Sequence, residues 1–294
     1  MNIIEETIIK NRPNISKSSL KTYESLLRNL HNKVFDNDNL NNYIERFNES
    51  DKIIKYLKDL EPRKRKTLLS ALVVITDKKE YRDLMLEDIK NYNNEENKQV
   101  KSSKQKENWV EKDMIIKLYK DLSNISNSLY KKQNLTSKEL QYIQKYIILS
   151  LLGGMYIPPR RSKDFVDFKI KNIDKDKDNY IDKNKLVFNS YKTAKTYGKQ
   201  EVEIPKTLKA IITKWIKVNP TEYLFFDTNN NKISNVKLNQ RLNLLFGKKA
   251  SVNILRHSYL SDKYGDMIDK QNDLDLDMSK MGSSKIQEKI YIKK

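Results

Sequence analysis

The chain has 294 residues, enough for two domains of ordinary size, and 37% of them are hydrophobic, enough to form buried cores. Its net charge of +19 favours a polyanionic partner, because fixed cations gain free energy by releasing counterions from phosphate. The absence of cysteine excludes disulfide frameworks and thiolate zinc sites, and two histidines disfavour a histidine metal cage. No apolar run reaches the roughly 18–20 residues that a membrane span needs, so we expect a soluble, intracellular protein without a membrane partner.

Residues 1–90 are predicted to form a helical domain. The clearest helix covers residues 16–34, where apolar side chains recur every three or four residues on one face. These side chains are Leu20, Tyr23, Leu27 and Leu30. Further helices are predicted over residues 53–60 and 67–75. The basic run 62–66 between them starts with a proline, which we expect to act as a helix breaker.

Residues 91–108 have almost no apolar side chains and cannot bury enough surface to fold alone, so we predict an interdomain linker there. A second domain is then predicted over residues 109–294. Its first strong signature is the capping box formed by Thr136 and Glu139. The helix behind it is apolar on most sides, and we expect it to run to about Tyr156.

Three strands are predicted next, joined in part by a turn at Gly198. They cover residues 165–170, 186–191 and 201–204. Helices are then predicted to start at four residues with capping or helix-opening character. These are Pro205, Ser234, Ser251 and Ser284. The fold class we predict is therefore mainly α with a small antiparallel β-sheet, that is, α+β.

Four segments carry side chains suited to phosphate chemistry. They are the turn with Arg160, Arg161 and Asp164, the hairpin with Lys192 and Lys195, the helix with Asn253, Arg256 and His257, and the tail with Tyr291. Taken alone, a lysine in a loop is usually a solvated surface residue, and a single tyrosine is usually a packing residue. The basic turn, taken alone, is explained equally well as a solvated turn without a function. Together they fit metal-free phosphoryl transfer, because arginine forks bind phosphate oxygens and neighbouring cations favour a nucleophilic phenolate.

The order of these segments resembles the tyrosine recombinase (phage-integrase) family. The stretches PPRRSKDF and YKTAKTYGKQ are most similar to integrases of virophages and related viral mobile elements. The resemblance covers residues from about 109 to the end. It implies a catalytic domain of that family, preceded by a helical core-binding domain over residues 1–90.

The resemblance assigns site residues one at a time. The family's first catalytic arginine precedes an acid by three positions, so Asp164 selects Arg161, with Arg160 as the alternative. The family's hairpin lysine precedes a threonine, which Lys192 fits best and Lys195 also fits.

The second family motif, His-x-x-Arg, reads Asn253 to Arg256 in this chain. Ser283 occupies a later position at which the family has a histidine or a tryptophan, and Tyr291 occupies the position of the family's nucleophile. Because two expected imidazoles are missing, the resemblance leaves proton transfer to the lysine or to His257.

The implied function is a site-specific DNA recombinase or integrase that acts through a 3′-phosphotyrosyl intermediate, without metal or cofactor. The implied partner is double-stranded DNA, bound by four protomers on two sites, in a host nucleus or a viral factory. Two alternatives remain: relaxation of DNA by a type IB topoisomerase activity, and a DNA-binding protein whose catalytic site has decayed.

Overall fold

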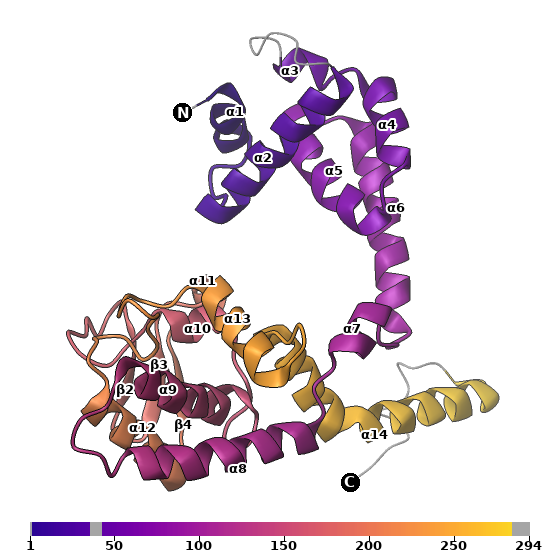
Figure 1. The fold of residues 1–294 in the computed structure, drawn as a ribbon. Coiled ribbons are helices and arrows are strands. Elements are labelled where there is room, and N and C mark those ends of the chain that lie inside the picture. The colour runs from indigo at the N-terminus through magenta and orange to yellow at the C-terminus, as the bar shows by residue number, and fades with distance from the viewer. Residues whose placement is uncertain (1, 36–42, 284–294) are drawn as a thin grey trace. The chain divides into compact units, whose positions relative to one another are not determined.

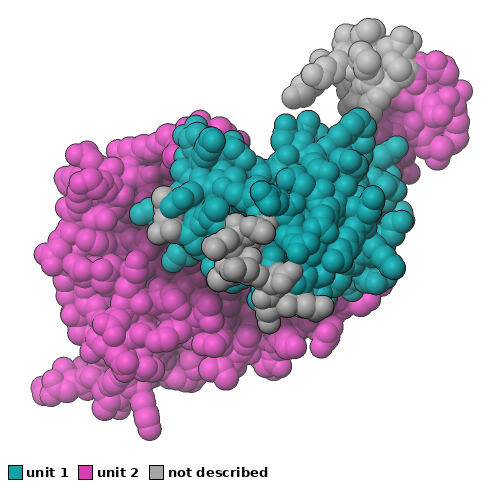
Figure 2. Space-filling model, turned by 90° about the horizontal axis from the view of Figure 1, so that it is seen from above, with its two compact units in different colours: residues 1–101 teal, residues 102–294 magenta. Residues whose placement is uncertain are grey.

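The computed structural model describes residues 2–35 and 43–283, and the chain divides into two compact units (Figure 2). The units are Met1–Lys101 and Ser102–Lys294. Their boundary falls inside the predicted linker 91–108. Most of that segment is nevertheless helical, because one helix continues to Asn97 and another covers Ser103–Asn108.

The first unit consists of helices packed around one apolar core (Figure 1). They are α1 (Ile3–Asn11), α2 (Lys17–Val34), α3 (Tyr43–Arg46), α4 (Ser50–Lys58), α5 (Pro62–Thr76) and α6 (Lys79–Asn97). The predicted stripe on α2 is confirmed, since Leu27 and Leu30 are buried and Leu20 and Tyr23 pack against the core.

The helix break before Pro62 is confirmed, because α4 ends at Lys58, but the run 62–66 does not lie between two helices: Pro62 opens α5 and the basic residues form its first turn. A proline at the first helical position loses no hydrogen bond, and its fixed φ suits the helix. The basic side chains that follow are engaged within the unit. Arg65 forms an ion pair with the fully buried Asp88. Arg63 pairs with the exposed Glu96.

The second unit is built on the buried helix α9, against which α8 and α12 pack. Its helices are α7 (Ser103–Asn108), α8 (Lys112–Leu129), α9 (Ser137–Leu152), α10 (Ser162–Val166), α11 (Ala194–Tyr197), α12 (Lys206–Val218), α13 (Asn235–Phe246) and α14 (Val252–Lys280). The Thr136 capping box is confirmed, but α9 ends at Leu152, four residues before the predicted Tyr156. A Gly153-Gly154 pair follows it, and Gly154 has a φ of +77°.

The sheet of the second unit has four strands in the order β1-β2-β3-β4. They are β1 (Phe168–Lys169), β2 (Asn179–Asp182), β3 (Lys185–Phe188) and β4 (Gln200–Glu203). The α+β class is confirmed, although the sheet is mixed rather than antiparallel, because β1 pairs with β2 in parallel. Part of the predicted strand 165–170 is wrong, since Phe165 lies in α10 and is buried there. The polar strand β2 was not predicted.

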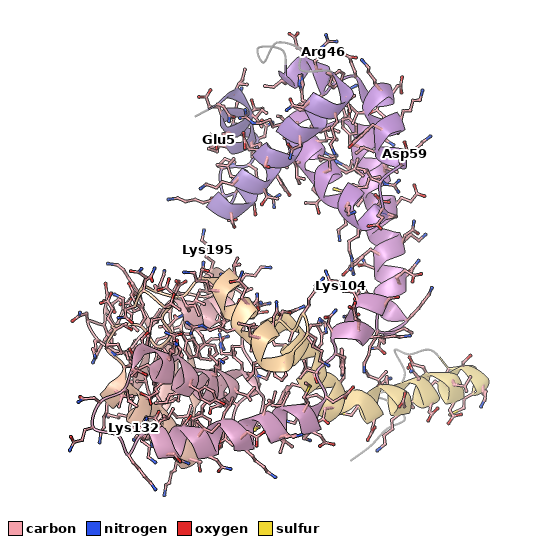
Figure 3. All side chains as sticks on the ribbon, in the orientation of Figure 1. Glu5, Arg46, Asp59, Lys104, Lys132 and Lys195 are labelled. Carbon is pink, nitrogen blue, oxygen red and sulfur yellow. The ribbon has the colours of Figure 1, made fainter. Side chains whose placement is uncertain are left out.

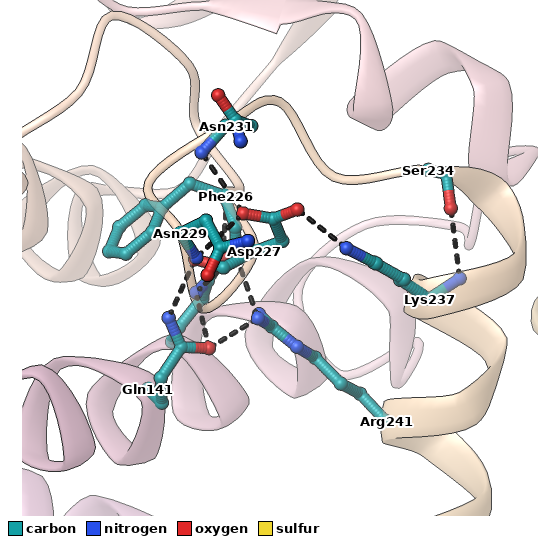
Figure 4. A network of polar contacts seen from close by, with 9 residues as sticks. Gln141, Phe226, Asp227, Asn229, Asn231, Ser234, Lys237 and Arg241 are labelled. Atoms are coloured by element: carbon teal, nitrogen blue, oxygen red, sulfur yellow. Dashed lines mark hydrogen bonds and ion pairs between the residues drawn. The ribbon is translucent and has the colours of Figure 1, made fainter.

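Helix α13 is held in place by a polar network around the loop that precedes it (Figure 4). The Asp227 carboxylate accepts hydrogen bonds from the backbone of Asn229 and Asn231 and pairs with Lys237 on α13. One turn further along α13, the Arg241 guanidinium donates to the carbonyl oxygen of Phe226 at 2.8 Å. These contacts fix α13 against the rest of the unit.

Helix α14 follows α13 and starts where the sequence predicts. Ser251 caps it, and the Asn239 side chain of α13 accepts a hydrogen bond from the Val252 backbone. The helix has 29 residues and extends well past the rest of the unit (Figure 1). None of the helices in the described ranges has the length and apolar composition required to cross a membrane.

Replacing Thr136 by alanine should destabilise the second unit by about 1 kcal/mol, because an N-cap hydroxyl bonded to a free backbone N–H is lost. The measurement is the free energy of unfolding of the full chain in urea. Ser137→Ala, a change at the exposed neighbouring position, is the matched control and should be nearly neutral. Equal effects of the two changes would contradict the cap.

Candidate functional site

The two adjacent arginines before α10 have different surroundings. The Arg160 side chain donates to Asp164 at 2.8 Å and to Gln200 on β4 at 2.9 Å. Its guanidinium carbon also lies 4.0 Å from the centre of the Phe188 ring. Arg161, by contrast, is half-buried, and its side chain forms no hydrogen bond or ion pair with any residue that the structure describes.

This arrangement corrects the expectation that Asp164 orients Arg161. Because Arg160 and Asp164 are separated by four residues, their side chains meet beside the first turn of α10. Arg160 therefore serves the fold, and Arg161 is the arginine that remains available to a ligand.

The Asp164 carboxylate is the buried negative charge of the site, with only 2% of the residue exposed. Burial raises the pKa of its carboxyl group above the usual range, because the charged form loses hydration. Three positive charges act on this pKa in the opposite direction: those of Arg160, Arg161 and Arg256. Arginines from two distant segments thus lie within electrostatic range of one buried carboxylate.

Arg256 is placed beside this group by α14. Burial lowers the pKa of its guanidinium, and repulsion from Arg161 lowers it further. Its Nη1 atom lies 3.4 Å from the Asn253 side-chain oxygen, one helical turn back. An anion between two partly buried guanidinium groups that repel each other would relieve the repulsion and occupy their donors.

The predicted hairpin exists as the antiparallel pair β3–β4, with Phe188 opposite Gln200. Lys192 lies on the connection between these strands and is exposed. Lys195 lies on α11 in the same connection, and its side chain points away from the body of the second unit (Figure 3). The base of the connection is ordered by Tyr191, which is buried and donates to the Gly198 carbonyl oxygen at 2.7 Å.

The other predicted residues lie on α14 or beyond it. Asn253 and His257 are exposed near its start, on the same side as Arg256. Ser283 follows the far end of the helix, and Tyr291 lies outside the described residues. At 1.5 Å per residue, the 24 residues from Arg256 to the end of α14 span about 36 Å.

The structure therefore places Arg161 and Arg256 within electrostatic range of Asp164 and of each other, and it does not bring Ser283 to them. Sequence reasoning assigned no role to Asn179 and did not foresee the contacts of Arg160. No local pattern marks Asn179, because its partners are 10 to 15 residues away in the chain, and the Gln200 partner of Arg160 is 40 residues away.

A pocket of about 490 Å³ lies elsewhere in the second unit, between α8, the end of α9 and α14. Ile115, Gly154 and Tyr259 are among its lining residues, and none of the predicted site residues lines it. Among the described residues, no group of acidic or histidine side chains is arranged to hold a metal ion. The candidate site thus lies outside this pocket and carries three arginines around one buried carboxylate.

Comparison with known proteins gives little further information. No family model and no curated protein sequence matches the chain. A crystal structure of XerA recombinase is similar to it with a TM-score of 0.36 and 12% identity, over 89% of this chain and 84% of that one. A likeness at this level is too distant to bear on function.

Arg160→Ala should destabilise the protein by about 3 kcal/mol, because it leaves the buried Asp164 carboxylate without its ion-pair partner. Arg161→Ala should change stability by no more than about 0.5 kcal/mol, since it removes no hydrogen bond of the described structure. Thermal unfolding of the two variants measures the difference. A larger loss for Arg161→Ala would show that the roles of the two arginines are reversed.

Proposed function

We propose that this chain breaks and rejoins DNA strands by the chemistry of a tyrosine recombinase, as a site-specific recombinase or integrase. The observation that supports this most is the pair Arg161 and Arg256, which come from separate segments and lie within electrostatic range of one buried carboxylate and of each other. The connection between β3 and β4, which carries the lysine, is joined to the arginine turn by hydrogen bonds. The net charge of +19 suits duplex DNA as the ligand.

In the proposed reaction, Arg161 and Arg256 bind the non-bridging oxygens of the scissile phosphate. Tyr291 loses its phenol proton to water, because the neighbouring cations favour the phenolate. The phenolate oxygen forms a bond to phosphorus while the bond from phosphorus to the 5′ oxygen breaks, and Lys192 gives that oxygen a proton. The products are a 3′-phosphotyrosyl ester and a free 5′-hydroxyl. Because the ester conserves the energy of the phosphodiester, a 5′-hydroxyl of either strand can reverse the step without ATP.

Asn253 and Ser283 occupy the two positions at which the family has imidazoles, and they have lesser roles in this proposal. Asn253 beside Arg256 can donate a hydrogen bond to phosphate but cannot transfer a proton, and the same holds for Ser283. His257 is exposed on the same side of α14 and is a second candidate for the proton transfer. Lys195 is the alternative to Lys192.

The first unit would supply sequence-independent contacts to DNA phosphates in this proposal. Its α5 presents Lys66, which lies over the ring of Tyr92. Arg65 is unsuited to such a contact, because its charge is committed to buried Asp88. Any contribution of the basic run 62–66 therefore comes from the side chains around Arg65.

The length of α14 bears on how protomers would assemble. The helix spans about 36 Å from Arg256 to its last residue, Lys280. Tyr291 lies beyond the described residues, so either the same protomer or a neighbouring copy can supply the nucleophile within a proposed tetramer on two DNA sites. An experiment separates these two arrangements.

The absence of both family imidazoles favours one other function, a DNA-binding protein that no longer cleaves. A DNA duplex nicked just beyond the cleavage point distinguishes the two, because the short leaving fragment diffuses away and traps the covalent intermediate. We expect the wild-type chain to become linked to this DNA and Tyr291→Phe to bind it without linkage. Binding without linkage by both proteins would favour the decayed site.

The arginines should affect cleavage far more than binding. Arg161→Ala and Arg256→Ala should each reduce the trapping rate by at least about 10²-fold, because their interaction strengthens as charge develops on the phosphate. Affinity for uncleaved DNA, measured at one fixed salt concentration, should change much less. A loss confined to affinity would remove these residues from the catalytic step.

Mixing two inactive variants tests where the nucleophile comes from. Arg161→Ala keeps the tyrosine and Tyr291→Phe keeps the arginines, so a mixture should regain trapping if the tyrosine serves a neighbouring protomer. Each variant alone is the control. A mixture as inactive as its components, while the wild type is active, would place both groups in one protomer.

A further inference from the structure

Asn179, the first residue of β2, has no solvent-exposed surface and uses its whole amide group in hydrogen bonds. Its Nδ2 atom donates to the carbonyl oxygens of Asp164 at 2.9 Å and Ser190 at 2.8 Å. Its Oδ1 atom accepts from the backbone N–H groups of Asn189 at 2.9 Å and Ser190 at 2.8 Å. Both amide protons and both acceptor positions of the side chain are thus occupied.

These four bonds join two segments that carry proposed reacting groups. The Asp164 carbonyl belongs to α10, three residues after Arg161. Ser190 is two residues before Lys192, at the point where the chain leaves β3. The amide of Asn179 therefore sets the start of the lysine connection relative to the arginine turn.

The contact is specific for an amide. Two carbonyl oxygens face Nδ2, so a carboxylate of the same shape would meet them with negative charge and without a proton to donate. The neighbouring contacts do not replace it. Asn189 holds the same connection only to Lys175 and Asp178, on the segment that enters β2.

We propose that Asn179 is a positioning residue for the strand-cleavage step, which aligns Lys192 with the leaving 5′ oxygen while Arg161 holds the phosphate. This inference rests on the proposed function. A displacement of the general acid by about 1 Å is enough to slow a proton transfer about 10²-fold.

The proton transfer gives a readout that a purely structural residue would not affect. With a normal phosphodiester, the bond from phosphorus to the 5′ oxygen breaks as Lys192 protonates that oxygen. With sulfur in place of the 5′ oxygen, the phosphorus–sulfur bond breaks and the sulfur leaves as a thiolate, which needs no proton. The position of Lys192 then ceases to limit the rate, whereas the arginines are still required.

The experiment measures covalent trapping by the full chain on a nicked duplex with either oxygen or sulfur at the 5′ position. The variants are Asn179→Asp, Asn179→Ala, Lys192→Ala and Arg161→Ala. Asn184→Asp, at an exposed asparagine in the β2–β3 turn, is the matched control. Melting temperature and DNA affinity are measured for each protein, and Asn179→Ser, which keeps one donor, replaces any Asn179 variant that does not fold.

On the oxygen substrate, we expect the Asn179 variants to trap DNA 10- to 100-fold more slowly than wild type, with unchanged affinity. On the sulfur substrate, they and Lys192→Ala should recover to within about threefold of wild type, and Arg161→Ala should not.

Three results would overturn the inference while the proposed function stands. The first is an Asn179 variant that cleaves the oxygen substrate at the wild-type rate. The second is an Asn179 variant that stays slow on sulfur although Lys192→Ala recovers. The third is a Lys192→Ala variant that does not recover on sulfur, which would remove the lysine from the proton transfer. A wild-type protein that traps neither substrate would instead overturn the proposed function, and this inference with it.

Discussion

The candidate site depends on one buried negative charge, the carboxylate of Asp164. An isolated carboxylate in a protein interior is costly, and the chain compensates it with arginines. Arg160 forms the ion pair with it, while Arg161 and Arg256 remain within electrostatic range without a direct bond to it. Because one negative charge faces three positive ones, the site retains a positive excess. An anion such as a phosphodiester would balance that excess.

The division of labour between the two adjacent arginines follows from helix geometry. Arg160 lies one turn before Asp164 and under the rings of Phe188 and Tyr191, so its charge is used inside the fold. Arg161 caps the short helix α10 and keeps its guanidinium donors available. The same ion pair that stabilises the turn therefore also determines which arginine is free to bind phosphate.

The small sheet serves mainly to connect the groups of the site. Its strands β3 and β4 carry the connection with Lys192, and Gln200 on β4 accepts a hydrogen bond from Arg160. Asn179 on β2 bonds the exit of β3 to α10. The arginine turn and the lysine connection are thus linked twice, by one guanidinium and one amide, although neither of these groups is proposed to touch the substrate.

The charge pattern along the sequence is a poor guide to which cations are available. The run 62–66 suggests a solvated basic patch, yet Arg65 lies against buried Asp88 and Arg63 pairs with Glu96. In both cases the acidic partner comes from α6, more than 20 residues further along the chain. Net charge predicts the class of partner. Which acidic side chain each cation pairs with depends on how the helices pack.

The sequence by itself determined the features that depend on near neighbours in the chain. The caps at Thr136, Ser234 and Ser251, the stripe on α2 and the α+β class follow from spacings of a few residues, because capping and helical faces are local. The resemblance also named Arg161 and Arg256, although no spacing shows that they meet. Only the tertiary structure decided that Arg160 rather than Arg161 pairs with Asp164, and that Asn179 joins two segments. The first depends on the burial of Asp164 and on Gln200, 40 residues from Arg160, and the second on partners 10 to 15 residues away. No local pattern records burial or such partners.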